Sequence, residues 1–142
     1  MAEVGTASDN KVVFELVAPE RLLASEEVDM VVAPGAAGDF GVLPNHSLLM
    51  ALLRPGVIEI WQGQHVTRRI FVGGGFAEVN ARGCVVLAEE ALPVEELDLE
   101  AARGRLRDAQ DDLGEAKDDA ARAAAAEREI AIAEAQIQAA GG

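Results

Sequence analysis

A change of periodicity near Pro93 divides the chain into two parts that require different architectures. The part up to Pro93 holds all five prolines, most of the glycines and several short Val- and Ile-rich runs. The part after it is dominated by Ala, Glu, Asp, Arg and Leu. Short apolar runs between turn residues are typical of strands, whereas spacings of three and four are typical of helices. We therefore expect a β head, residues 1–92, and a helical tail, residues 93–142.

The head should be an antiparallel sandwich or barrel. Its candidate strands are bounded by Pro-Gly, Gln-Gly-Gln and Asn-Ala-Arg-Gly turn signals, and they cover residues 12–17, 28–32, 57–61, 66–72, 76–79 and 84–87. No helical pattern of ten residues separates these runs, which disfavours a parallel α/β fold.

The tail should form two helices folded back as an antiparallel hairpin. Two apolar stripes recur at helical spacing: Leu99, Ala102, Leu106, Ala109 and Leu113, then Ala123, Ala126, Ile130, Ala133 and Ile137. Gly114 and the Asp118-Asp119 pair offer a break between them, with one of the aspartates as N-cap. An Ala-rich seam buries little apolar area. We therefore expect a hairpin that is marginal by itself and able to detach from the head.

The charge balance restricts the partners. The chain has 25 acidic and 12 basic side chains, a net charge of −13. This charge repels nucleic acid and anionic lipid, so proteins are the expected partners. Residues 1–10 show no signal peptide and no run approaches the ~20 apolar residues of a membrane helix. We expect a soluble, cytoplasmic chain unless a partner holds it at a membrane.

No residue pattern predicts catalysis, a cofactor or a metal site. The single cysteine, Cys84, lies in an apolar run and is interpreted as a small buried hydrophobe, which fits a reducing compartment. The glycine run 73–75 lacks the Lys and Ser or Thr of a phosphate loop, so a bulge or a close backbone contact is expected. His46 and Ser47 are adjacent and would point to opposite faces of a strand. The acid pairs at 89–90 and 95–96 are interpreted as a solvated hinge.

Residues 38–56 closely resemble the signature of the ATP synthase epsilon family: Gly and an acid, a hydrophobe-Gly-hydrophobe unit, a Pro-x-His turn and a closing Pro-Gly. Residues 17–21, 71–79 and 85–91 resemble further segments of the same family, in order and in register. The resemblance covers residues 11–92, and a helical tail of the family's length follows.

This resemblance implies a mainly β fold, a flattened sandwich of about ten antiparallel strands, followed by an α-helical hairpin. It also implies a non-catalytic rotor subunit in the central stalk of an F-type ATP synthase. Such a subunit joins the gamma subunit to the c-ring and so couples proton-driven rotation to ATP synthesis. Its place would be peripheral, at the cytoplasmic face of the inner membrane, without direct lipid binding.

The resemblance also assigns contact residues. It places the c-ring contact in a turn formed by Gly38, Asp39, Phe40 and Gly41, where Asp39 would pair with a basic residue of a c-ring loop. It assigns His46 to the gamma-facing surface, the alternative being a turn residue that hydrogen-bonds locally. Leu43, Leu48 and Met50 are either core or gamma contacts.

The tail departs from the family pattern in its charge. In many members the hairpin opens and its basic second helix meets an acidic loop of the beta subunit, which inhibits ATP hydrolysis. Here the tail holds thirteen acidic and six basic residues. Like charges disfavour that contact. We expect weak or no inhibition, even if the hairpin reaches the alpha and beta subunits.

A regulatory ATP site is not favoured. Some family members bind ATP through an Ile/Leu-Asp-x-x-Arg-Ala motif, and Leu97-Asp98 matches its start. Ala101 replaces the arginine, for which Arg103 is the nearest substitute. Asp98 is more simply an N-cap of the first tail helix.

Two other functions remain as alternatives. One is a sandwich adapter with a helical hairpin in some other assembly, which co-purification with gamma would separate from the epsilon interpretation. The other is a small enzyme that uses the acids at the domain junction, and the lack of a positioned nucleophile or base argues against it.

Overall fold

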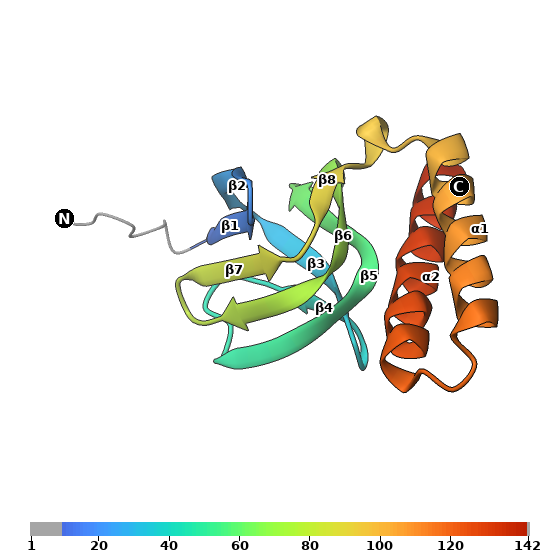
Figure 1. Cartoon of the computed structure of the whole chain (residues 1–142). Helices are drawn as coiled ribbons and strands as arrows, with labels where there is room; N and C mark the ends of the chain where they lie inside the picture. Colours follow the sequence, from blue (N-terminus) through green and yellow to red (C-terminus); the bar gives the residue numbers. More distant parts are fainter. Residues whose placement is uncertain (1–9, 142) are drawn as a thin grey trace. The chain divides into compact units, whose positions relative to one another are not determined.

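The computed structural model describes residues 10–141, which form two compact units (Figure 1). One unit ends at Pro93 and the other begins at Val94. The first contains the strands β1 (Val12–Ala18), β2 (Arg21–Val28), β3 (Met30–Gly35), β4 (Gly38–Val42), β5 (Leu49–Gln62), β6 (His65–Val79), β7 (Gly83–Ala88) and β8 (Ala91–Pro93). The second contains a short 3-10 helix (Val94–Glu96) and the helices α1 (Leu99–Ala116) and α2 (Ala120–Gly141).

The head is one sheet folded on itself into a sandwich. Its strand order is β2-β1-β7-β6-β5-β3-β4, and β8 pairs with β6. The long strands β5 and β6 pair along their whole length; the first half of β6 also pairs with β8 and its second half with β7. β1 joins the two ends of the head sequence, because it pairs with β2 antiparallel and with β7 in parallel. The expected fold class is confirmed.

The glycine run 73–75 lies inside β6, where the sheet folds over. Gly74 and Gly75 have φ of 106° and 147°, which only glycine adopts readily. A Cβ on Gly75 would lie 2.4 Å from the carbonyl oxygen of Leu87 on β7. The run is thus a close backbone contact, as expected, and Pro55 pairs with Gly73 across the same fold.

The strand count differs from the expected figure of about ten, because the described residues form eight strands. Pro55-Gly56 and residues 73–75 were expected to separate strands, yet β5 and β6 run through them. The expected strand 28–32 corresponds to β3, but its start is misplaced: β2 ends at Val28 and β3 begins at Met30, on either side of Asp29. The Asp29 carboxylate accepts hydrogen bonds from Lys11 Nζ and the Gly63 backbone N–H, both at 2.5 Å, and so fixes the corner. β2 is a polar edge strand, which the apolar pattern missed.

The core lies between the two layers of the head. Burial alternates along β1, with every second side chain inward. The largest fully buried side chains include Phe14, Phe71, Leu16, Ile58, Ile60 and Ile70. Cys84 is buried too, and desolvation raises the pKa of its thiol to about 12, so it stays a protonated core residue as expected.

The hairpin follows the expected helical pattern with one exception. Asp98 caps α1 by accepting from the N–H groups of Glu100 and Ala101, at 3.0 and 3.2 Å. The Asp119 side chain accepts from the N–H of Arg122 at 3.0 Å, which confirms the predicted N-cap of α2. Gly114 does not break the helix, because α1 continues to Ala116 and ends at Lys117, whose φ is 39°. The fully buried positions of α1 are Ala102, Ala109 and Ala116.

Candidate functional site: an apolar docking face on the head

Large apolar side chains cross the outer, solvent-facing side of five neighbouring strands. The strand registers align one residue from each of β5, β6, β7, β1 and β2. We call this set the apolar row: Leu52, Phe76, Leu87, Val17 and Leu22. Neighbouring strands lie about 4.8 Å apart, so the row is roughly 19 Å long.

The apolar row is open to solvent. Leu52, Leu22 and Leu87 expose 66, 58 and 54% of their surface, whereas Phe76 and Val17 are half-buried. On β1 and β7 the residues on either side of Val17 and Leu87 face the core and are buried. The layer therefore buries one apolar face in the fold and leaves a second without cover. Contiguous exposed apolar surface of this kind marks an interaction site.

A second row runs beside the apolar row, two residues away along each of the first four strands. We call it the mixed row, since apolar and acidic side chains alternate along its first four positions: Met50, Glu78, Val85 and Glu15, followed by Ser25. Met50 is strongly exposed and Val85 is partly exposed. The docking face therefore combines an apolar strip with a carboxylate-bearing flank.

Three side chains of this region were expected to be either core or gamma contacts. Met50 belongs to the mixed row, and Leu43 and Leu48 are exposed in the segment that precedes β5, Leu48 at 72%. The core alternative is therefore wrong for all three. His46 Nδ1 donates a hydrogen bond to the carbonyl of Ser47 at 2.6 Å, so this half-exposed ring does bond locally.

Most of the apolar row escaped the sequence interpretation. Val17, Phe76 and Leu87 were expected in strands without a role, Leu52 was only part of the family signature, and Leu22 was assigned to no element. A signal was present in β7, where Cys84-Val85-Val86-Leu87 is apolar on both faces of a strand that pairs on both sides. A strand with two apolar faces requires cover on both of them.

The residues expected at the c-ring form the tip of the β3–β4 hairpin and the start of β4. Gly38 has φ of 140°, and Asp39 is exposed. The expected turn is thus largely strand, because β4 begins at Gly38. Phe40 packs against the core. Asp39 has a partner within the chain: Arg54 Nη2 lies 2.6 Å from its Oδ1, and Arg54 Nη1 donates to the carbonyl of Gly35 at 2.6 Å.

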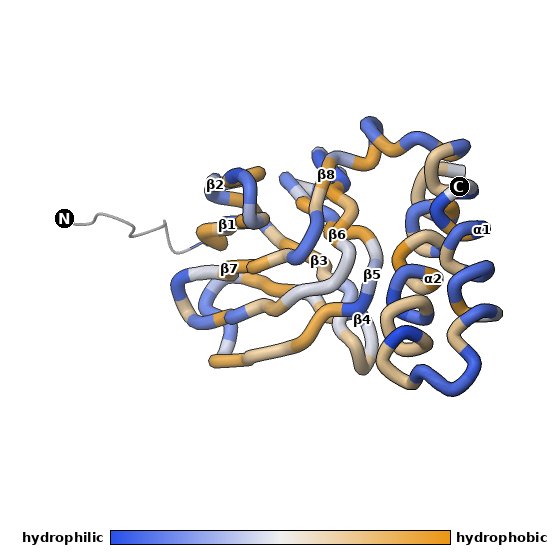
Figure 2. The backbone as a smooth tube through the Cα atoms, viewed as in Figure 1, coloured by the Kyte–Doolittle hydropathy of each residue, from blue (hydrophilic) through white to orange (hydrophobic). Residues whose placement is uncertain are grey.

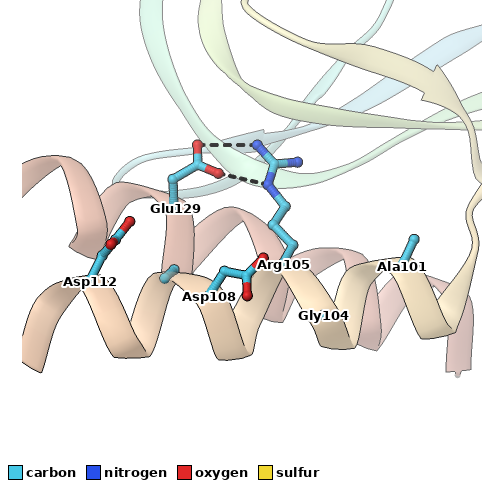
Figure 3. Close-up of a pocket in the computed structure, with 7 residues that line it drawn as sticks. Ala101, Gly104, Arg105, Asp108, Asp112 and Glu129 are labelled. Carbon is cyan, nitrogen blue, oxygen red and sulfur yellow. Dashed lines mark hydrogen bonds and ion pairs between the residues drawn. The ribbon is translucent and has the colours of Figure 1, made fainter.

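A cleft of about 440 Å³ lies within the hairpin, between α1 and α2 (Figure 3). Arg105 of α1 spans it and donates two hydrogen bonds to Glu129 of α2, Nε to Oε1 at 2.8 Å and Nη2 to Oε2 at 3.1 Å. These hydrogen bonds lower the pKa of Glu129. Asp108 and Asp112 line the same cleft, which makes it a poor host for phosphate.

The two residues considered for regulatory ATP lie elsewhere. Asp98 is engaged as the N-cap of α1, and Arg103 Nη1 pairs with Glu100 Oε2 at 2.9 Å. Neither lines the cleft. Within residues 10–141, no three His, Cys, Asp or Glu side chains gather closely enough to hold a metal ion. Neither helix of this described part has the length and apolar character needed to cross a membrane.

Comparison with known proteins gives a consistent family. Residues 11–94 match the family model of the ATP synthase delta/epsilon chain, β-sandwich domain. The chain is 54% identical over 129 residues to an ATP synthase epsilon chain from Rhodospirillum rubrum, covering 91% of this chain and 96% of that one. It is 53% identical over 103 residues to an epsilon chain from Paramagnetospirillum magneticum, covering 72% and 77%.

Solved structures show the same architecture. A chain of the Euglena gracilis mitochondrial ATP synthase, in an assembly of OSCP, F1 and c-ring, superposes with a TM-score of 0.78 at 27% identity, covering 94% of this chain and 82% of that one. A chain from the Tetrahymena thermophila mitochondrial ATP synthase central stalk and c-ring superposes with a TM-score of 0.51 at 14% identity, covering 65% and 72%. At that identity, the second likeness supports the fold alone.

Proposed function

The chain belongs to the ATP synthase epsilon family and is a central-stalk subunit of an F-type ATP synthase, and from this premise we propose that its head joins gamma to the c-ring without catalysing a reaction itself. In this role it transmits rotation from the proton-driven ring to the stalk. We place it at the cytoplasmic face of the membrane, held there by its protein partners and not by lipid.

The observation that carries the proposal is the apolar row. Five side chains from five strands form one exposed strip on a rigid sheet, and their burial would stabilise a complex by about 25 cal/mol per Å² of apolar surface. A coupling subunit has to resist torque, and a sheet holds its side chains in fixed register. We assign gamma to this face, with Leu43, His46 and Met50 at its margin.

Binding to isolated gamma tests this assignment. Leu87→Asp places a charge at the centre of the apolar row and should weaken binding at least thirtyfold, the size of a central hot spot. Gln64→Asp, in the exposed β5–β6 turn, adds the same charge away from the row and should bind like the wild type. Equal binding by both variants, each folded by circular dichroism, would show that gamma docks elsewhere.

We assign the c-ring to the β3–β4 tip. Asp39 is exposed there, but Arg54 already pairs with it, so a basic c-ring residue would have to share or displace Arg54. An exposed pair of this kind contributes only ~0–1 kcal/mol, which makes the exchange affordable. Asp39→Lys should reduce proton pumping in reconstituted enzyme, and Glu27→Lys on the β2 edge serves as the control. Unchanged pumping by Asp39→Lys would remove this residue from the c-ring contact.

We propose that the hairpin inhibits ATP hydrolysis weakly or not at all. The exposed side chains of α2 include Glu127 and Glu134, and Glu129 neutralises Arg105 of α1. An acidic loop of the beta subunit would meet net negative charge. Hydrolysis by the complex should change less than twofold when residues 94–142 are deleted; strong activation on deletion would contradict this proposal.

We also propose that the hairpin works without bound ATP. The arginine of its cleft is held by Glu129, and Asp108 and Asp112 would repel a triphosphate. Calorimetric titration with ATP should give no heat of binding at micromolar to low millimolar nucleotide. A micromolar dissociation constant would overturn this statement.

A further inference from the structure

The two carboxylates of the mixed row have no cation of the described part of their own chain beside them. Four acids of the head pair with cations: Asp29 with Lys11, Asp39 with Arg54, Glu26 with Arg68 and Glu59 with Arg69. Among the described residues, neither Glu78 nor Glu15 makes an ion pair within 4.0 Å. Arg82 lines the same hollow as Glu15 without reaching it.

Both carboxylates lie inside the footprint of any partner that covers the apolar row. Glu78 is two residues from Phe76 on β6, and Glu15 is two residues from Val17 on β1. Residues two apart on a strand are about 6.8 Å apart along it. A protein surface that buries Phe76 and Leu87 therefore also removes water from Glu78, and from Glu15 on the far side of β7.

Removing water from an ionised carboxylate is costly unless a cation or a hydrogen-bond donor replaces it. None of the six cations of the head pairs with Glu78 or Glu15: Lys11, Arg54, Arg68 and Arg69 pair with other acids, Arg21 lies on β2, and Arg82 lines the hollow beside Glu15 without forming an ion pair with it. The replacement has to come from the partner. A partner without cations at these positions would lose much of the free energy that burial of the apolar row provides.

We propose that the surface of gamma which covers the apolar row carries two basic side chains, one opposite Glu78 and one opposite Glu15. The proposal rests on the assignment of gamma to this face and adds the chemistry by which gamma is recognised. The two carboxylates belong to strands separated by β7, so the cations should be about 10 Å apart across the strands.

Surface plasmon resonance with isolated gamma tests the proposal at low and high salt. Glu78→Lys and Glu15→Lys should each weaken binding tenfold or more at low salt, and the loss should shrink as salt screens the repulsion. Gln64→Lys, in the exposed β5–β6 turn, adds a positive charge away from both rows and should alter binding less than twofold. Thermal melting of each variant checks that the head is folded.

The outcomes separate this proposal from the assignment on which it rests. If Glu78→Lys and Glu15→Lys bind like Gln64→Lys while Leu87→Asp abolishes binding, gamma docks on the row without the two cations, and the proposal is wrong. If Leu87→Asp also binds like the wild type, the docking face itself is wrong. Tighter binding by Glu78→Gln would mean that this carboxylate is buried without a cation, which likewise contradicts the proposal.

Discussion

The head and the hairpin are stabilised by different means within one chain. The head buries large β-branched and aromatic side chains, such as Phe14 and Ile70, with no exposed surface. The fully buried positions of α1 are alanines, and Leu106 between them is only partly buried. Figure 2 shows long orange stretches along the strands, whereas deep orange in the helices is confined to short segments between pale orange and blue ones.

This difference predicts that the hairpin is the less stable of the two units. An alanine seam buries little apolar area, so ion pairs between the two helices contribute a larger share of the stability of the hairpin. These pairs join Arg105 to Glu129, and Arg122 to Asp112 and Glu115. Such exposed pairs contribute ~0–1 kcal/mol each and weaken with salt. The head should therefore stay folded under conditions that separate the helices.

The largest expected difference comes from truncating one side chain in each unit. Phe14→Ala should lower the free energy of unfolding of the head by ~3–5 kcal/mol, because it opens a cavity in a closed core. Leu106→Ala should cost the hairpin only about 1 kcal/mol, since part of this side chain already meets water. The single tryptophan, Trp61 on β5, reports urea unfolding of the head by fluorescence, and far-UV circular dichroism reports the helices. Equal losses of unfolding free energy in the two variants would contradict the proposed difference in packing between the head and the hairpin.

A glycine-to-alanine change should have opposite signs in the two units. Gly75→Ala should destabilise the head by at least ~1–3 kcal/mol, because its φ is 147° and the new Cβ would meet the Leu87 carbonyl. Gly114→Ala should stabilise the hairpin by ~0.5–1 kcal/mol, since this glycine sits within α1 with open space around it. Denaturant midpoints measure both, and a shift in the same direction would contradict the expectation.

Reversing one charge across the hairpin should produce a smaller effect. Arg105→Glu and Glu129→Arg should each lower the protection of α2 amides by ~0.5–1 kcal/mol, as measured by hydrogen exchange. The double variant restores the pair with reversed polarity and should recover most of that loss. If the double variant loses as much amide protection as the two single variants lose together, Arg105 and Glu129 are not energetically coupled.

The smallest expected effect is a pH dependence at the corner of the head. Hydrogen bonds from Lys11 and Gly63 lower the pKa of Asp29, so the folded state favours the charged carboxylate. The stability gained is present above the ordinary carboxyl pKa of about 3.9 and is lost as pH falls through the lower value of the folded protein. The difference in unfolding free energy between wild type and Asp29→Asn should therefore be constant near neutrality and shrink in acid. If the difference in unfolding free energy grew in acid, folding would have to raise the pKa of Asp29 and not lower it.

Local patterns predicted the parts of the fold that depend on neighbours in sequence. Asp98 and Asp119 were recognised as helix starts because a cap acts on the next two or three residues. The length of β5 and β6 was missed, because whether Pro55-Gly56 ends a strand or bends it is decided by the partner strand. The apolar row was missed for the same reason. Leu52 and Leu22 are thirty positions apart, and only the register of five strands aligns them.

The place of β1 between β2 and β7 sets the order in which the head can be completed during synthesis. Residues 12–18 leave the ribosome first, yet their parallel partner, residues 83–88, emerges about seventy residues later. Until then one edge of β1 has no neighbour, and its alternating apolar side chains have no closed interior. The nascent head can therefore close only after almost all of it has been translated, and a chaperone would meet it as an open half-sheet.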